Sequence, residues 1–408
     1  MTREQWQRQQ RRERERQRRE QEKAHREHIR QLRKESYEAA RGPLDLPFLV
    51  LVLVLTAIGL IMLFSASFPS AYYINNDPTH YFVRQGIFAV GGLVAMVVIG
   101  KINYQRFRGL AKLALYGSIV LLVLVIIPGN PLSVTRNNAT RWLGIGDLFT
   151  FQPSEIAKLG VILYFSDDIS RKKDKMQTFR QGILPYVVIL GVIALLMMLE
   201  PHLSGTVLIL GIGAVLMLVG GIRWKWVGGV LLLAAVGAYL VLGVMGYGHS
   251  RLSMWLNPWL DAQGDGYQMV QSYLAIGSGG LLGVGLGKSR QKYLYLPEEH
   301  NDFIFAVVCE ELGLIGAALI MLLFAALVLR GYWIALNARD RFGSLLAVGV
   351  TTLIAMQTIL NIAVVTGAVP TTGISLPFFS YGGTALMIQL AEMGVVLSVS
   401  RQMKAPPS

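Results

Sequence analysis

Long apolar segments recur along the chain from Leu46 to the C-terminal end, and short polar or glycine-rich stretches separate them. Each segment approaches the ~20 residues that an α-helix needs to cross the hydrocarbon core of a bilayer. This pattern predicts an all-α polytopic membrane protein with about ten transmembrane helices. The expected spans are residues 46–66, 82–100, 110–128, 155–169, 183–199, 205–221, 225–246, 303–329, 343–366 and 383–400.

The composition agrees with a membrane protein, because the mean hydropathy is +0.47 and 53% of the 408 residues are hydrophobic. The single cysteine, Cys309, lies inside an apolar segment, so the chain can form neither an intrachain disulfide nor a thiolate metal cluster. The formal net charge of +13 would suit nucleic acid, but the basic residues gather in the N-terminal region and in short loops. We therefore expect no nucleic-acid partner.

Composition divides the chain into three parts. Residues 1–44 form a basic tail with almost no aliphatic side chains, which we expect to be disordered or a fraying helix. Residues 45–402 form the membrane domain, and residues 403–408 form a short C-terminus. The tail has no apolar stretch typical of a cleavable signal peptide. It either only fixes the orientation of the first span, or also docks on anionic lipid or a cytoplasmic partner.

The distribution of lysine and arginine predicts the orientation of the spans. When the tail is placed in the cytoplasm, most basic clusters in the loops fall on the cytoplasmic side, as the positive-inside rule requires. Both termini are then cytoplasmic. Two loops face the other side, namely residues 129–153 and the long extracytoplasmic loop of residues 247–301 between the seventh and eighth spans. Long loops inside compact domains are usually functional, so we expect the chemistry there.

The long loop carries a candidate catalytic carboxylate. A turn-forming stretch between Trp255 and Gln268 contains Asp261 and Asp265. At the edge of the hydrocarbon, desolvation can raise the pKa of a carboxyl group toward the working range of a general base. Asp261 is therefore a candidate base, although a turn or cap aspartate is the simpler interpretation of the stretch by itself. Asp265 lies between two glycines and indicates a turn.

Basic residues on the same side are candidates for binding an anion. Residues 283–289 end like a phosphate-binding loop, but they lack the first glycine of that motif and a preceding strand. Lys288, Arg290 and Lys292 are equally consistent with a site for an anionic headgroup and with a solvated loop. Arg141 has no acidic neighbour at helical spacing, which makes it a better candidate for a phosphate ligand.

Polar side chains also fall inside the apolar segments. Ionised groups at that depth cost about 2.5–3.5 kcal/mol each, so they are usually paired or functional. Lys158 is placed to pair either with Glu155, three residues before it, or with a glutamate of the eighth span. We expect structural roles for Glu155, Lys158, Glu310, Glu311, Gln357 and Asn361.

The residues just before the eighth span have two interpretations. Asn301 or Asp302 is suited to cap the N-terminus of the helix. His300 and its acidic neighbours could hold a metal ion, but a single histidine is weak support for a metal site.

Short motifs follow one another in a fixed order through nearly the whole membrane domain. They are Arg141-Trp142, Gln152-Pro153-Ser154-Glu155-x-x-Lys158, Glu200-Pro201, Asn257-Pro258-Trp259-x-Asp261, Gly266-Tyr267-Gln268, Gln271-Ser272, Ala275-Ile276-Gly277-Ser278-Gly279-Gly280, Leu296-Pro297-Glu298-x-His300-x-Asp302-Phe303-Ile304-Phe305 and Leu376-Pro377-Phe378-x-Ser380-Tyr381-Gly382-Gly383. Together these motifs resemble the SEDS family.

The resemblance implies a ten-helix peptidoglycan glycosyltransferase of the bacterial cytoplasmic membrane. It would polymerise lipid II together with a class B penicillin-binding protein and other divisome proteins. Asp261 would be the essential acidic residue, deprotonating the acceptor sugar for an inverting attack that releases undecaprenyl pyrophosphate. A divalent cation, Mg²⁺ or Mn²⁺, could assist, with ligands that the sequence does not identify. The residues implied to bind substrate or pyrophosphate are Arg141, Gln268, Gln271, Lys288, Lys292 and His300.

Within the family, Glu200-Pro201 and residues 310–313 are more similar to the division branch, FtsW, than to the elongation branch, RodA, which implies a role in septal cell-wall synthesis. Two positions depart from the family pattern. His202 stands where an aspartate commonly follows Glu-Pro, and Asn301 replaces a usual threonine. A lipid II flippase and a non-catalytic divisome scaffold remain as alternatives.

Overall fold

The computed structural model describes residues 42–403, except residues 128, 137–138, 146–148, 224–225, 227 and 230–248. Most of this part of the chain is helical. The long helices are α2 (Leu46–Asn75), α3 (His80–Lys101), α4 (Phe107–Ile126), α5 (Pro153–Lys172), α6 (Leu184–Leu199), α7 (Leu203–Val219), α11 (Ile304–Leu336), α12 (Arg341–Val365) and α13 (Gly383–Ser400). Short turns of 3-10 or π type lie at Tyr104–Arg106, Lys173–Gln177 and Phe179–Ile183.

The helices agree with the apolar segments of the sequence. Each predicted span within the described residues coincides with a helix, although the limits differ by several residues. The span predicted at 225–246 lies almost wholly outside the described residues. Among the residues described, seven helical segments are long and apolar enough to cross a membrane, and α7 is a shorter apolar helix. The chain is therefore a helical, multi-pass membrane protein.

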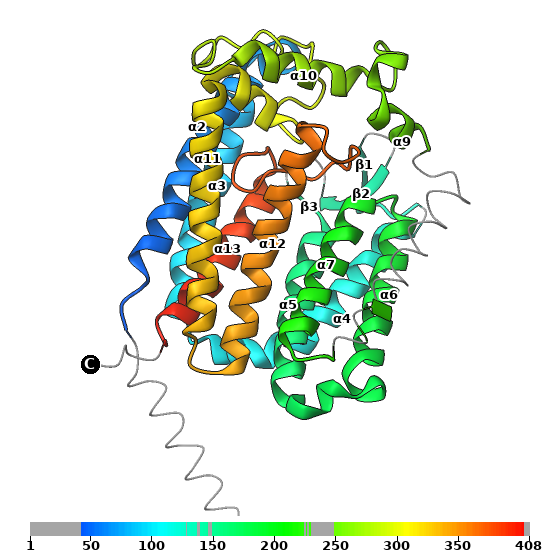
Figure 1. Ribbon diagram of the computed structural model, residues 1–408, viewed down its shortest axis with the longest axis vertical. Coiled ribbons are helices and arrows are strands. Elements are labelled where there is room, and N and C mark those ends of the chain that lie inside the picture. The colour runs from blue at the N-terminus through cyan, green and yellow to red at the C-terminus, as the bar shows by residue number, and fades with distance from the viewer. Residues whose placement is uncertain are drawn as a thin grey trace, which may run out of the picture. The chain divides into compact units, whose positions relative to one another are not determined.

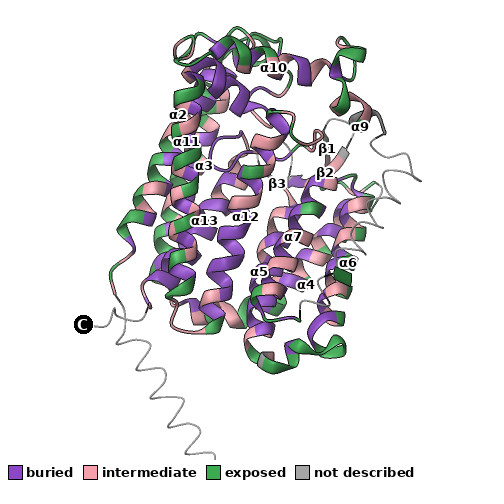
Figure 2. Cartoon of the chain, in the orientation of Figure 1, coloured by how far each residue is buried: buried purple, intermediate pink, exposed green. Residues whose placement is uncertain are grey.

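Exposed residues lie along the outward faces of these helices (Figure 2), and many of them are large and apolar. Ile87 on α3, Leu113 on α4 and Leu322 on α11 are 68%, 70% and 65% exposed, respectively. Contiguous apolar surface of this kind is rare on a monomeric soluble protein. Acyl chains of lipid would cover these faces without the cost that water would impose.

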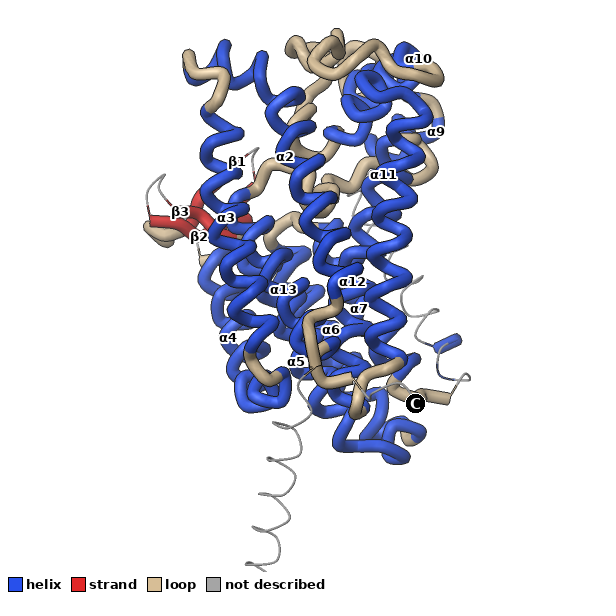
Figure 3. Tube along the Cα trace, turned by 90° about the vertical axis from the view of Figure 1, so that its left-hand side faces the viewer, coloured by secondary structure: helices blue, strands red, loops and turns tan. Residues whose placement is uncertain are grey.

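Helices that are far apart in the sequence pack side by side (Figures 1 and 3). α13 runs along α3, α4 runs along α5, and α11 packs against α12. Glycines allow the backbones of α3 and α13 to approach each other closely. A Cβ atom on Gly394 would lie 2.6 Å from the carbonyl oxygen of Met96, and one on Gly92 would meet the side chain of Leu390. Small residues of this kind are typical of interfaces between membrane helices.

α11 contains a sharp break at Gly313, where φ is 65° and ψ is −172°. The next two N–H groups, of Leu314 and Ile315, donate to the carbonyl oxygens of Gly280 and Leu281 at 2.9 and 3.2 Å. The segment after α10 thus supplies the hydrogen bonds that the broken helix lacks. Glycine is required because a Cβ atom at this position would overlap the backbone nitrogen of Gly283.

The remaining elements lie toward one end of the bundle, which we call the sheet end (Figure 1). They are β1 (Ser133–Arg136), β2 (Ala139–Ile145), β3 (Phe149–Phe151), α9 (His249–Leu256), a 3-10 turn at Pro258–Asp261 and α10 (Tyr267–Gly279). The long loop expected at residues 247–301 therefore contains helices in its described part.

The strands form one antiparallel sheet in the order β1-β2-β3. Val134 pairs with Trp142, and Leu143 pairs with Phe151. The sequence predicted only a loop here and an all-α fold, so the sheet is a correction to that prediction. β-branched and aromatic side chains favour strands, and strand pairing provides partners for backbone groups that would otherwise be buried unpaired.

Candidate active site

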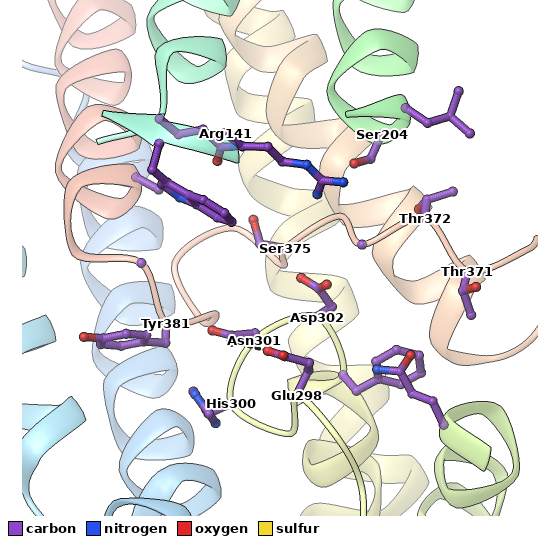
Figure 4. A pocket seen from close by; sticks show the side chains of 18 of the residues that line it. Arg141, Ser204, Glu298, His300, Asn301, Asp302, Thr371, Thr372, Ser375 and Tyr381 are labelled. Atoms are coloured by element: carbon purple, nitrogen blue, oxygen red, sulfur yellow. Dashed lines mark hydrogen bonds between the residues drawn. The ribbon is translucent and has the colours of Figure 1, made fainter. Parts of the chain in front are cut away.

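A cavity of about 690 Å³ lies at the sheet end. Its wall is built by the start of α3, strands β2 and β3, the turn between α6 and α7, α9, α10, residues 298–303 and residues 371–385. In Figure 4, Arg141 lies on one side of the cavity, and Glu298, His300 and Asp302 lie on the other. A concave site where polar groups from many elements converge is the expected form of an active site.

The loop before α11 is held in place by its own backbone and by the segment before α13. Glu298 has a φ of 58°, and its carbonyl oxygen accepts hydrogen bonds from the N–H groups of Asn301 and Phe303. The N–H of Tyr381 donates to the carbonyl oxygen of His300 at 2.8 Å, and the hydroxyl of Ser380 donates to that of Asn301 at 2.8 Å. These contacts fix the direction of each side chain in the loop.

Asn361 of α12 joins this loop to the other wall of the cavity. Its amide group donates to the carbonyl oxygens of Asp302 and Ile374 at 2.8 and 2.7 Å. This buried contact gives Asn361 a structural role at the floor of the site. Gln357, one turn earlier on the same helix, is also buried.

Asp302 directs its carboxyl group into the cavity (Figure 4). The sequence suggested that Asp302 or Asn301 caps α11, but Phe303 occupies the N-cap position and no side chain caps the helix there. The pKa of Asp302 is raised to about 6, first by burial and then by the nearby Glu298, while Arg141 and His300 act in the opposite direction. A carboxyl group in this pKa range is suited to general-base chemistry near neutral pH.

Arg141 extends from β2 and is anchored by the turn between α6 and α7. Its Nε atom donates to the carbonyl oxygen of Glu200 at 3.2 Å, and its Nη2 atom donates to that of Pro201. These bonds hold the permanently charged guanidinium at the edge of the cavity. This placement is compatible with the predicted role of Arg141 in binding an anion.

The turn that holds Arg141 carries two side chains with shifted pKa values. The pKa of Glu200 is raised to about 8 by burial, although Arg141 opposes the shift. The pKa of His202 is lowered to about 3, by burial first and then by Arg141 and Lys158. His202, one of the two residues that depart from the family pattern, is therefore neutral, and its ring lies 3.4 Å from the amide of Gln152.

Asp261, the predicted base, is exposed and is not among the residues that line the cavity. Its carboxylate accepts a hydrogen bond from the N–H of Asp265 at 3.0 Å and so closes a turn. Asp265 and Gln268 do line the cavity, and the amide of Gln268 donates to the carbonyl oxygen of Pro297 at 3.3 Å. Gln271, further along α10, is half-buried and lies outside the lining.

The two lysines predicted to bind pyrophosphate also lie outside the cavity lining. Lys288 is exposed. Lys292 is buried, with its Nζ atom 2.8 Å from Glu311 and 3.1 Å from the hydroxyl of Ser65. The charge of Lys292 is thus paired with that of Glu311. Lys292 was expected to bind pyrophosphate together with Arg141, but only Arg141 lines the cavity.

Glu310 and Glu311 hold the segment that follows α10. Glu310 accepts hydrogen bonds from the N–H groups of Arg290 and Gln291 at 2.9 and 3.3 Å and from the hydroxyl of Ser289. Together with the Lys292 pair, these contacts satisfy carboxylates whose burial would otherwise be costly.

Lys158 pairs with Glu155 at 2.7 Å, which is the local alternative of the two that the sequence left open. Lys158 is 2% exposed, so this pair lies inside the bundle. Glu392 of α13, which the sequence reading did not single out, is also buried. The signal that could have identified it is a lone carboxylate within the last apolar segment.

Among the described residues, no group of three or more His, Cys, Asp or Glu side chains is arranged to hold a metal ion. Magnesium, however, is commonly held by one or two carboxylates together with substrate phosphates. The cavity carboxylates Glu298 and Asp302 are of the type needed for such a site.

Comparison with known proteins agrees with the motifs that surround this cavity. A family model described as "Cell cycle protein", which covers FtsW, RodA and SpoVE, matches residues 45–405. The chain belongs to this family. The resemblance drawn from the motifs is thus confirmed.

Relatives cover most of the chain. A probable peptidoglycan glycosyltransferase FtsW of Geobacter metallireducens is 41% identical over 364 residues, which cover 89% of this chain and 96% of the relative. Stage V sporulation protein E of Bacillus subtilis is 44% identical over 360 residues, or 88% of this chain and 97% of the relative.

Two solved structures share the fold. A chain from a peptidoglycan synthase complex has a TM-score of 0.74 at 25% identity, covering 88% of this chain and 98% of that chain. The rod shape determining protein RodA of Thermus thermophilus has a TM-score of 0.65 at 26% identity, covering 89% of this chain and 99% of that chain.

Proposed function

We propose that this protein is a peptidoglycan glycosyltransferase that polymerises lipid II for septal cell-wall synthesis. The observation that carries the proposal is the polar cavity at the sheet end, whose wall includes Arg141, His300 and Asp302 from the motifs that resemble the family. The activity follows the names of the relatives, and the septal role follows the FtsW name in particular. The sporulation relative supports a spore-wall role as the alternative.

The proposed topology has ten transmembrane helices in the bacterial cytoplasmic membrane, with both termini in the cytoplasm. The sheet end and the long loop of residues 247–301 then face the outside, where lipid-linked sugars are polymerised. The bias of lysine and arginine toward the opposite loops supports this orientation. The cavity would open toward the outer leaflet.

In the proposed reaction, Asp302 is the general base. Its carboxylate takes the proton from the 4-hydroxyl of the acceptor sugar, and the hydroxyl oxygen forms a bond to the anomeric carbon of the donor. The bond from that carbon to undecaprenyl pyrophosphate breaks, so the configuration inverts and no covalent enzyme intermediate is needed. Asp302 is proposed because its carboxyl group faces the cavity and burial raises its pKa to about 6. Asp261, the base that the family resemblance implies, is the alternative.

Arg141 would stabilise the negative charge that develops on the leaving pyrophosphate. Its guanidinium is fixed by backbone carbonyls and stands across the cavity from Asp302 (Figure 4). Preorganised charge aimed at the leaving group needs no rearrangement during the reaction. A bound Mg²⁺ or Mn²⁺ ion would add positive charge at the phosphates, and Glu298 is a candidate protein ligand for it.

A class B penicillin-binding protein is the proposed partner, with other divisome proteins around it. The structural likeness to a chain of a peptidoglycan synthase complex supports such an assembly. Glycan strands made at the cavity would then be cross-linked by the partner.

The test compares two carboxylates in one assay. The protein is purified with its cognate penicillin-binding protein and given labelled lipid II and Mg²⁺, and the glycan products are separated on a gel. Wild type should produce polymer, Asp302→Asn should produce none, and Asp261→Asn should keep most of the activity. Loss of activity in Asp261→Asn alone would return the role of base to Asp261. Absence of polymer from wild type beside an active partner would favour a flippase or a scaffold.

A further inference from the structure

His300 and Glu299 form a hydrogen-bonded pair in the wall of the cavity. The Nδ1 atom of His300 lies 3.3 Å from Oε1 of Glu299. Glu299 is 5% exposed, and the same oxygen accepts a hydrogen bond from the hydroxyl of Ser70 on α2. The carboxylate is thus tied to a long helix of the bundle, and the edge of the imidazole that faces it is fixed.

The plane of the His300 ring is also fixed. The ring stacks on Tyr81 with centroids 4.7 Å apart and an interplanar angle of 26°. Tyr381 packs edge-on against it at 5.9 Å. The N–H of Tyr381 further holds the carbonyl oxygen of His300. A ring clamped by two aromatic side chains and a carboxylate keeps one orientation, which is the condition for precise positioning of a ligand.

This arrangement determines which nitrogen carries the proton. An ionised carboxylate only accepts hydrogen bonds, so Nδ1 of His300 must be the donor toward Glu299. In the neutral ring, Nε2 then has a lone pair and no hydrogen. His300 lines the cavity, and the one hydrogen bond of its ring found among the described residues is made through Nδ1. Nε2 therefore offers the cavity a hydrogen-bond acceptor.

An acceptor of this kind selects its ligand by chemistry. It suits the hydroxyl groups of a sugar, which can donate, and it repels the oxygens of a pyrophosphate, which cannot. His300 also lies two residues before Asp302 in the same loop, and both side chains line the cavity. The family resemblance implies for His300 the same role as for Arg141 and the lysines, which is to bind substrate or pyrophosphate.

We propose that Glu299 and His300 form a dyad that binds a hydroxyl group of the saccharide substrate. His300 accepts the hydrogen bond through Nε2, and Glu299 is a positioning residue that sets the tautomer and the orientation of the ring. The proposal rests on the proposed glycosyltransferase function and assigns a sugar-binding role within the same cavity.

The kinetic test is a double-mutant cycle on the complex with its partner. Glu299→Ala and His300→Ala should each lower kcat/KM for lipid II by about tenfold, the effect expected from losing one well-placed hydrogen bond. Because Glu299 acts through His300, the double variant should be no slower than His300→Ala alone. Glu299→Gln should keep most of the activity, since its amide oxygen can still accept the Nδ1 proton. The dyad would be overturned if the losses in kcat/KM of the two single variants multiplied in the double variant. It would also be overturned if Glu299→Ala kept full activity.

A second measurement does not depend on activity. Nitrogen NMR of histidine-labelled wild type should show His300 protonated at Nδ1 and not at Nε2, with its signal identified by its loss in His300→Ala. The opposite tautomer would overturn the proposal even if the variants were slow. The correct tautomer in a protein that makes no polymer would instead refute only the glycosyltransferase function.

Discussion

The carboxylates of the sheet end differ in what their neighbours allow them to do. Asp261 and Asp302 both lie in loops, yet Asp261 closes a turn through the N–H of Asp265, whereas Asp302 faces the cavity. The difference arises from their backbones, because Asn361 and the segment before α13 hold the Asp302 loop from two sides. Residue type alone gives both the same chemistry, and the family resemblance points to Asp261 rather than to Asp302.

We expect the pH dependence of polymerisation to report Asp302. Its pKa is raised to about 6, so the carboxyl group is protonated below that value and cannot accept the hydroxyl proton. The rate of the wild-type complex should therefore rise with pH through about 6 and level off above it. Initial rates measured from about pH 5 to about pH 8 would test this. A profile without a rise in that range would contradict the assignment.

The buried pair of Lys292 and Glu311 should be essential for stability. Lys292→Met would remove the ion-pair partner of the buried Glu311 carboxyl group, and breaking a buried pair in this way typically costs about 3–5 kcal/mol. We expect a clear fall in the melting temperature in detergent, with much of it recovered in the double variant Lys292→Met/Glu311→Leu. Lys288→Met, at an exposed position four residues earlier, is the matched control and should melt like wild type. Equal melting of the Lys292→Met protein and wild type would refute this role.

At the scale of elements, the broken helix α11 links the membrane bundle to the sheet end. Residues 280–285 donate to and accept from α11 around Gly313, so backbone hydrogen bonds join the segment after α10 to α11. Both flank the cavity. The break is therefore part of how the bundle supports the site.

Gly313→Ala should destabilise this junction. Its φ of 65° and ψ of −172° lie in a region that is essentially restricted to glycine, where another residue costs about 1–3 kcal/mol. The added Cβ would also overlap the backbone of Gly283. We expect a lower melting temperature and lower activity, whereas Gly277→Ala in α10, where a Cβ meets open space, should be tolerated. A lower melting temperature for Gly277→Ala than for Gly313→Ala would contradict the role of the break.

At the scale of the whole molecule, the apolar faces define where lipid lies, but the direction of insertion depends on charge. Basic residues concentrate at the end of the bundle opposite the cavity in the proposed topology. The cavity then faces the side on which lipid-linked substrates are polymerised.

Cysteine labelling tests this orientation. In a Cys309→Ser background, Lys288→Cys should react with a membrane-impermeant maleimide added to intact cells, because residue 288 is exposed beside the sheet end. Lys101→Cys, exposed at the other end of α3, should react only after the membrane is opened. The opposite pattern of labelling would invert the topology and exclude an outward-facing cavity.

The sequence by itself determined the features that depend on local pattern. Apolar length predicted the helices, since the cost of unpaired backbone in hydrocarbon leaves a helix as the natural form of each span. The i,i+3 spacing gave the pairing of Lys158 with Glu155 as one of two alternatives, and the structure contains that pair. Ordered motifs identified the family, which the family model confirms.

The tertiary structure decided which side chains share the site. Asp302 reaches the cavity because Asn361 holds its carbonyl oxygen, and Lys292 is withdrawn from it because Glu311 lies beside it. The sheet arises from strand pairing that loop composition did not reveal. These outcomes depend on contacts between residues far apart in the chain. Burying a charge or a backbone group is costly unless it has a partner, and only the tertiary structure determines which partner lies beside it.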